Sequence, residues 1–150
     1  MEAQGWRLFA HPLFEAQLEE LTRRVERLAS KDPQGYKSHP AIKLLATINH
    51  YIRVVIPHDP NSPAFRQGNA LGPANRHWFR AKFHGRYRLF FRFSAAHKVI
   101  VYAWVNDERG LRKAGAKTDP YAVFRTMLES GNPPDSFADL LRRSRQMGRV

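Results

Sequence analysis

The sequence predicts a single α+β domain over residues 1–150, with helices packed on one face of an antiparallel sheet. Three observations predict it. The expected elements run in the order strand, two helices, three strands and C-terminal helices, residues 78–93 alternate with a period of two, and the length suits one core of two packed layers. An apolar fraction of 43% excludes a disordered chain, and the longest apolar run, residues 99–105, is too short to span a bilayer.

The first expected elements are a strand and two helices. Residues 6–9 alternate apolar and polar side chains, as a short strand does. Apolar residues at spacings of three and four predict a helix from Pro12 to Lys31, and a second helix starts near Pro40 and ends before Pro57. A short loop containing glycine makes these two helices an antiparallel hairpin.

The most strongly patterned stretch, residues 78–93, predicts two strands joined at His84-Gly85-Arg86. A three-residue turn there pairs Phe83 with Tyr87, and this register separates an apolar face from a basic one. Like charges across a strand pair are tolerated only on a solvated face or on one that meets anions, so this basic face is the candidate site. Residues 99–105 are apolar on both faces and predict a central third strand.

Helices are expected again after the sheet. Asp119-Pro120 has the form of an N-cap followed by a first-turn proline, and this helix stops at Gly131. Ser136 and Asp139 indicate a capped final helix, whose basic end, about 142–150, we expect to fray.

Charge and composition narrow the function classes. The chain has no cysteine and no stretch typical of a secretory signal at its start, so we expect a cytoplasmic protein without disulfides. The formal net charge is +12, and residues 61–106 contain eight Lys and Arg but no acidic residue. A face kept basic for solubility normally mixes both signs, so this block indicates a polyanionic partner, a nucleic acid rather than a membrane.

The basic strands carry groups that suit metal-free RNA cleavage. Attack by the 2′-hydroxyl needs a base, an acid for the leaving 5′-oxygen and cations around the phosphate. Arginine holds two phosphate oxygens at once, and a lysine among arginines suits proton exchange. The candidate catalytic residues are Arg80, Lys82, Arg86 and Arg88, with His84 either in an acid–base role or simply in the turn. The same residues would equally serve a module that binds RNA without cutting it.

The sequence gives little support for metal or cofactor chemistry. The seven histidines are scattered and no carboxylate lies near the basic strands, so no metal site and no cofactor are expected. Tyr87, Phe91 and Phe93 share a face with Leu89 and are expected in the core. Tyr121, beside a helix start, is the better candidate for stacking on a base.

Several short motifs between Gly5 and Phe137 occur in one order that is similar to a known family. They are Gly5-Trp6, Ala10-His11-Pro12, Ser62-Pro63-Ala64-Phe65-Arg66, Gly85-Arg86-Tyr87-Arg88-Leu89, Trp104-Val105-Asn106-Asp107-Glu108, Lys117-Thr118-Asp119 and Gly131-Asn132-Pro133-Pro134. They resemble the YhaV family of toxins, which belongs to the RelE-like superfamily of bacterial type II toxin–antitoxin systems. The resemblance implies a RelE-like toxin fold, endonucleolytic cleavage of mRNA with arrest of translation and growth, and a cognate AbrB-like antitoxin of the swapped-hairpin type.

The resemblance also implies roles for particular residues. Arg80, Lys82 and Arg88 match the basic positions on the strands of RelE-like toxins, and Arg109 and Arg112 match more loosely a phosphate-contacting arginine. The candidate RNA-binding residues are Arg66, Arg92, Arg109, Arg112, Lys113 and Tyr121. The chain departs from the family at Ala114, where a tyrosine is expected, and at Pro120, where alanine is usual.

Two other functions stay open at this point. One is an RNA-binding or ribosome-binding module that blocks translation without cleavage. The other is a DNA-binding co-regulator. Because no helix-turn-helix signal is present, operator DNA is expected to be reached only through the toxin–antitoxin complex. The expected RNA partner is mRNA, either free or bound to the ribosome.

Overall fold

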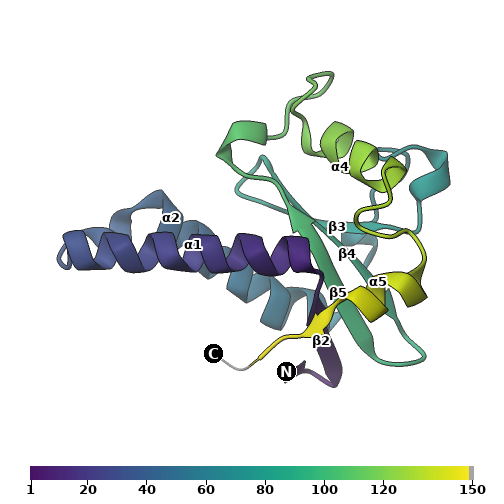
Figure 1. Cartoon of the computed structure of the whole chain (residues 1–150), viewed down its shortest axis with the longest axis horizontal. Coiled ribbons are helices and arrows are strands. Elements are labelled where there is room, and N and C mark those ends of the chain that lie inside the picture. Colours follow the sequence, from purple (N-terminus) through teal and green to yellow (C-terminus); the bar gives the residue numbers. More distant parts are fainter. Residues whose placement is uncertain (149–150) are drawn as a thin grey trace.

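The computed structural model describes residues 1–148 and confirms the α+β class (Figure 1). Its helices are α1 (Pro12–Lys31), α2 (Pro40–His50), α3 (Ile56–His58), α4 (Pro120–Glu129) and α5 (Phe137–Arg143). Its strands are β1 (Glu2–Ala3), β2 (Trp6–Ala10), β3 (Phe79–Phe83), β4 (Tyr87–Ser94), β5 (Val99–Val105) and β6 (Arg145–Gln146). They form one sheet in the order β1-β2-β5-β4-β3, with β6 added to β2.

The sheet is mixed, not wholly antiparallel as predicted. β3, β4 and β5 form an antiparallel meander, but β2 runs parallel to β5, with Leu8 opposite Ile100. A parallel neighbour needs a long connection, and the helices and hairpin between β2 and β5 supply it. β5 is therefore central, as its apolar sequence predicts.

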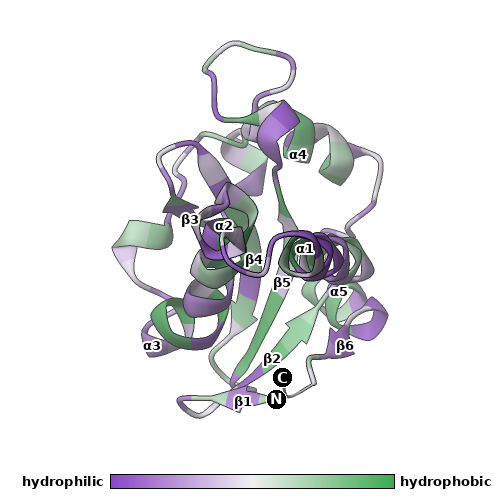
Figure 2. Cartoon of the chain, turned by 90° about the vertical axis from the view of Figure 1, so that its left-hand side faces the viewer, coloured by the Kyte–Doolittle hydropathy of each residue, from purple (hydrophilic) through white to green (hydrophobic). Residues whose placement is uncertain are grey.

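The helices cover both faces of the sheet, which corrects the prediction of one covered face. Leu89 and Phe91 of β4 pack toward α1 and α2, whereas Phe90 packs toward α4, where its ring stacks on Phe124 with centroids 4.2 Å apart. Figure 1 shows β5 with α1 on one side and α4 on the other, and Figure 2 shows β5 in the green of hydrophobic residues. Strands that are apolar on both faces need cover on both. The face that carries Arg80 and Arg88 is therefore covered in part by α4.

The β3–β4 hairpin has the predicted register. Phe83 pairs with Tyr87 across the turn, and Lys82 pairs with Arg88. Gly85 adopts a φ of +73°, a left-handed conformation that glycine adopts without strain. The register places Arg80, Lys82 and Arg88 on the same face of the sheet, the one that α4 covers in part.

The second helix continues past its predicted end, through Pro57 to His58. Residues Tyr51–Val55 form a π-helical turn, in which the Ile56 N–H donates a hydrogen bond to the Tyr51 carbonyl. Because Pro57 has no N–H, the carbonyl of Ile52 has no helical partner. The hydroxyl of Tyr102 on β5 donates to that carbonyl at 2.7 Å, and this bond joins the helix to the sheet.

The C-terminal helices begin at the predicted caps. The Asp119 carboxylate accepts from the Tyr121 N–H, and the Ser136 hydroxyl accepts from the Asp139 N–H. The basic end of the chain is expected to fray, but its described part lies against β2. There β6 pairs with β2, and the Met147 N–H donates to the Leu8 carbonyl. The prediction of a frayed end also covers residues 149–150, which lie outside the described residues. No helix within residues 1–148 has the length and hydropathy needed to cross a membrane.

Candidate functional site

Two arginines from neighbouring strands meet at one tyrosine hydroxyl. The Nε of Arg80 on β3 donates to the Tyr121 oxygen at 2.8 Å, and the Nε of Arg88 on β4 donates to it at 3.1 Å. The cap at Asp119 starts α4 so that Tyr121 lies over the two strands. Each of the three residues is only 7% exposed. The arrangement holds both guanidinium groups in fixed positions.

Backbone carbonyls hold a second nitrogen of each arginine. The Nη1 of Arg80 donates to Ala64 at 2.9 Å, and the Nη1 of Arg88 donates to Gly85 and Tyr87 at 3.0 and 2.9 Å. Neither Nη2 has a hydrogen bond within residues 1–148. Every fully buried side-chain nitrogen among these residues has a hydrogen-bond partner. Because the two Nη2 atoms have none, they are not fully buried and reach solvent. Each arginine therefore keeps one nitrogen available for a ligand.

The charge of this cluster is not balanced. Among the described residues, neither Arg80 nor Arg88 forms an ion pair, whereas Arg112 pairs with Asp119 at 2.7 Å. Buried charges in proteins are normally paired, because removing an ion from water costs several kcal/mol. Three arginines and one carboxylate leave two positive charges in excess. An anion that bridges Arg80 and Arg88 would supply the missing partner.

Arg112 joins the cluster from the loop after β5. Its guanidinium carbon lies 4.8 Å from the centroid of the Tyr121 ring. Its backbone N–H donates to the Arg86 carbonyl at 2.9 Å, and the Arg86 Nε donates back to the Arg112 carbonyl at 3.1 Å. Asn106 also ties this loop to the hairpin, because its side chain accepts from the Arg88 N–H at 2.7 Å and donates to the Arg86 carbonyl at 3.1 Å. We call Arg80, Arg88, Arg112 and Tyr121 the arginine cluster.

Three predicted residues lie at the rim of the arginine cluster. Lys82 is exposed, lies directly opposite Arg88 and makes no side-chain hydrogen bond or ion pair within the described part of the chain. Arg86 and Lys113 are also exposed, and the Lys113 N–H donates to Asp119 at 2.7 Å. These side chains are placed to meet a ligand that enters the cluster.

Two further candidates lie apart from the cluster. The Nε2 of His84 is 2.8 Å from the hydroxyl of Thr47 on α2, which covers the opposite face of the sheet. His84 also has a φ of +48°, in keeping with a turn residue. Arg109 is paired with Asp107 at 3.0 Å, and its side chain is 87% exposed.

Arg92 is engaged elsewhere, whereas Arg66 is exposed and its backbone pairs with Phe79 at the start of β3. Arg92 donates to the Asp135 carbonyl at 2.6 Å, and its guanidinium lies 5.2 Å from the Trp78 ring centroid. Burial lowers the pKa of Arg92, and the nearby Asp135 charge partly opposes this effect. Arg66 donates to the Asn61 side chain at 3.3 Å. Of the predicted site residues, the structure thus brings together those of the arginine cluster and its rim, but not His84, Arg92 and Arg109.

Tyr121 has a different place from the one expected. One face of its ring lies under Arg112 and its hydroxyl holds two arginines, so it is not an open platform for base stacking. The sequence does not reveal this arrangement, nor the contacts of Asn106. The Asp119-Pro120 pair predicts the cap alone, because the partner Arg112 depends on the path of the intervening loop.

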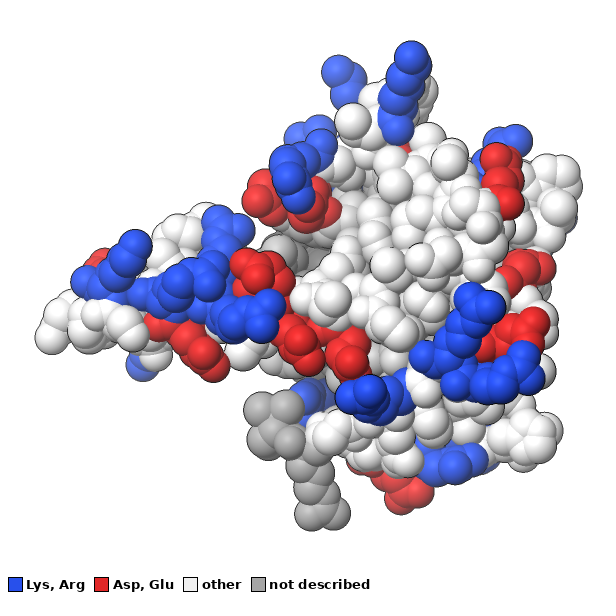
Figure 3. All heavy atoms as spheres, in the orientation of Figure 1, with Lys and Arg blue, Asp and Glu red and all other residues white. Residues whose placement is uncertain are grey.

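Charges elsewhere on the surface are more mixed. Figure 3 shows basic side chains projecting from the loop at the top of the molecule, whereas both signs alternate along α1, where Glu20 pairs with Arg23 and Arg27. Within residues 1–148, no three His, Asp or Glu side chains gather as metal ligands. The arginine cluster and its rim differ from α1 in that, among the described residues, only Asp119 balances their positive charges.

Comparison with known proteins confirms the resemblance to YhaV toxins. A family described as "toxin with endonuclease activity, of toxin-antitoxin system" matches residues 8–145. The chain is 47% identical over 144 residues to the Ribonuclease toxin YhaV of Escherichia coli strain K12 and to the Toxin YhaV of Escherichia coli O157:H7. These matches cover 95% of this chain and 94% of each relative. The chain therefore belongs to the YhaV family, toxins with endonuclease activity from toxin–antitoxin systems.

Proposed function

We propose that this chain is an endoribonuclease that cleaves mRNA without a metal ion and thereby inhibits translation and growth. The endonuclease activity of its family and the ribonuclease name of its K12 relative support this reading. The observation that carries it is the buried pair of Arg80 and Arg88, which share one phenol oxygen and have no carboxylate partner within residues 1–148. A phosphodiester is the anion that this pair fits.

The reaction uses the substrate's own 2′-hydroxyl as the nucleophile. Its oxygen bonds to phosphorus while the bond from phosphorus to the 5′-oxygen breaks. The 2′-hydroxyl proton passes to a base, and the leaving 5′-oxygen takes up a proton. The products are a 2′,3′-cyclic phosphate and a 5′-hydroxyl. Arg80 and Arg88 stabilise the charge that builds up on the non-bridging oxygens, since their donors are already fixed in place.

Lys82 is the group proposed to move the proton. It lies opposite Arg88 on the same face, and its ammonium has no partner in residues 1–148 that would need to be displaced. Arg86 and Lys113, at the rim of the cluster, then bind the flanking phosphates. Lysine is suited to proton exchange, whereas arginine stays charged.

An antitoxin is expected because the family belongs to toxin–antitoxin systems. We propose an AbrB-like antitoxin of the swapped-hairpin type that covers the arginine cluster with acidic residues. Charge complementarity of this kind gives fast association and excludes RNA from the same surface. Operator DNA is then bound only by the complex.

The test uses end-labelled mRNA incubated with the protein in EDTA, with and without ribosomes, followed by mapping of the fragment ends. Fragments that end in a 2′,3′-cyclic or 3′-phosphate support the proposal. RNA that is bound but stays intact under every condition would overturn it in favour of a module that blocks translation. Cleavage that needs added Mg²⁺ would refute the metal-free mechanism.

A further inference from the structure

A hollow of about 310 Å³ opens beside the arginine cluster. It lies between the loop 112–119, the first turns of α4 and Ala70. Tyr121 joins the two sites, because it lines the hollow while its hydroxyl holds Arg80 and Arg88. This volume is at the lower end of the range for ligand pockets, so it suits one nucleotide and not a longer segment.

Arg112 forms a rigid wall of the hollow. Its guanidinium is fixed on one side by the Tyr121 ring and at its edge by the Asp119 carboxylate. One third of the side chain is exposed, so the guanidinium is accessible from the hollow. Bases of single-stranded RNA stack on arginine planes of this kind. A platform that is already ordered loses little entropy on binding.

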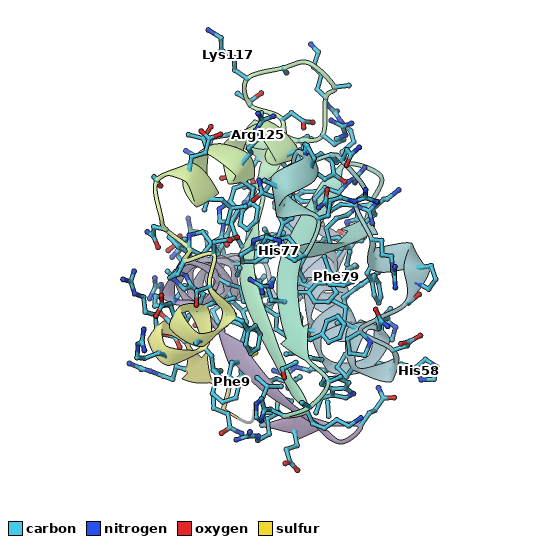
Figure 4. All side chains as sticks on the ribbon, turned by 90° about the vertical axis from the view of Figure 1, so that its right-hand side faces the viewer. Phe9, His58, His77, Phe79, Lys117 and Arg125 are labelled. Carbon is cyan, nitrogen blue, oxygen red and sulfur yellow. The ribbon has the colours of Figure 1, made fainter. Side chains whose placement is uncertain are left out.

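Arg125 of α4 lines another side. Its guanidinium lies over Gly72. A β-carbon added to this glycine would be in van der Waals contact with the guanidinium carbon, at 3.8 Å. Figure 4 shows Arg125 on α4, below the loop that carries Lys117. Its side chain is 58% exposed and has only a long ion pair, 3.6 Å, to Glu129. An arginine pairs best with two acceptors on one base edge, and among the four bases guanine presents them as O6 and N7.

The rest of the hollow suits a planar guest. Its remaining walls are small residues, namely Ala70, Ala114, Gly115, Ala116 and Ala122. The one carboxylate in the lining, Asp119, has both oxygens engaged, one by Arg112 and the Lys113 N–H and the other by the Tyr121 N–H. No unengaged negative charge in the lining opposes a nucleotide.

We propose that this hollow binds a guanine base next to the cleaved phosphate, stacked on Arg112 with its edge facing Arg125, and that it sets the base preference of cleavage. The inference rests on the proposed ribonuclease function. Since the base must leave its neighbours to enter, the substrate segment is single-stranded.

The experiment cleaves an RNA pool with a randomised internal segment and sequences the fragment ends. With the wild-type chain, guanine is expected to be enriched on the order of tenfold at one position beside the cut, the discrimination typical of an arginine–guanine pair. Ala122→Leu fills the hollow and Arg125→Ala removes the donors. In both variants the enrichment is expected to fall to background while fragments still form.

Matched controls come from exposed positions of α5. Ala138→Leu and Arg142→Ala repeat the two substitutions on that helix and should keep the wild-type profile. A wild-type profile without guanine enrichment, or enrichment that survives both Ala122→Leu and Arg125→Ala, overturns the inference and leaves the ribonuclease function intact. If the wild-type chain makes no fragments, the proposed function itself fails. Circular dichroism verifies that each variant is folded.

Discussion

Replacing Tyr121 with phenylalanine removes one oxygen atom and leaves the ring in place. That oxygen accepts from the Nε of Arg80 at 2.8 Å and from the Nε of Arg88 at 3.1 Å, and both residues are buried. A hydrogen bond to a charged group contributes about 1.5–3 kcal/mol, so two at the lower limit give about 3 kcal/mol of unfolding free energy. In a protein of this size, that loss lowers the melting temperature by about 6–12 °C.

The assay is urea unfolding followed by circular dichroism, with Tyr36→Phe as the control. The Tyr36 hydroxyl makes no hydrogen bond within residues 1–148, so its removal should change the unfolding free energy by no more than about 0.5 kcal/mol. Single-turnover cleavage at saturating RNA adds a second readout. Loosened arginines should slow it by about tenfold or more, since misplacement by about 1 Å costs up to about a hundredfold.

One result would refute this reasoning. If Tyr121→Phe matches Tyr36→Phe in both unfolding free energy and cleavage rate, the hydroxyl does not organise Arg80 and Arg88. A loss of stability with an unchanged rate would assign the hydroxyl to folding alone and remove it from the positioning of the phosphate-binding groups.

Three further predictions concern Arg88, the strand residues Arg80 and Lys82, and the cap residue His11. Arg88→Lys keeps the charge but loses the planar fork, so single-turnover cleavage should fall about a hundredfold, and a near-normal rate would contradict this. Arg80→Ala and Lys82→Ala should each reduce the slope of log affinity against log salt by about 0.7, as measured by RNA titration. Burial, and then Arg143, lower the pKa of His11, whose Nδ1 accepts from the Leu13 N–H. Its stabilising contribution is therefore complete above pH 6.5 and is lost as the pH falls below it. His11→Asn keeps a cap, so melting temperatures between pH 5 and 7.5 should show less acid loss than in the wild type; an equal loss would exclude His11.

Local patterns predicted the parts of the fold that depend on neighbouring residues. The alternation around Gly85 and the three-residue turn are enough to fix the pairing of Phe83 with Tyr87. Asp119 and Ser136 likewise identify helix starts, because a cap bonds only to residues two or three positions away.

Contacts between distant segments were not predictable in this way. Alternation shows that β4 has a basic face, but not that α4, about thirty residues later, covers that face in part. The π-helical turn before Pro57 depends on Tyr102, fifty residues beyond Ile52, which donates to the freed carbonyl. No local pattern contains that partner.

The candidate site was likewise predictable only where it depends on local sequence patterns. Arg80 and Arg88 were found because strand alternation decides which face they share. Charge selects Arg92 and the family resemblance selects Arg109, yet the structure engages them with Asp135 and Asp107, away from the cluster. Positive charge indicates a polyanion as the partner, but the local acceptors decide which arginines remain available to bind it.

The most direct test of phosphate binding by Arg80 and Arg88 is the single-turnover cleavage rate in EDTA for Arg80→Ala and Arg88→Ala, with Arg23→Ala as the control. Arg23 is an exposed arginine on α1, paired with Glu20 and outside the cluster. If Arg80 and Arg88 hold the scissile phosphate, each substitution lowers the rate by about 10²–10³-fold in folded protein, and Arg23→Ala leaves it unchanged. Equal rates in all three variants would show that the buried arginine pair is not the catalytic site.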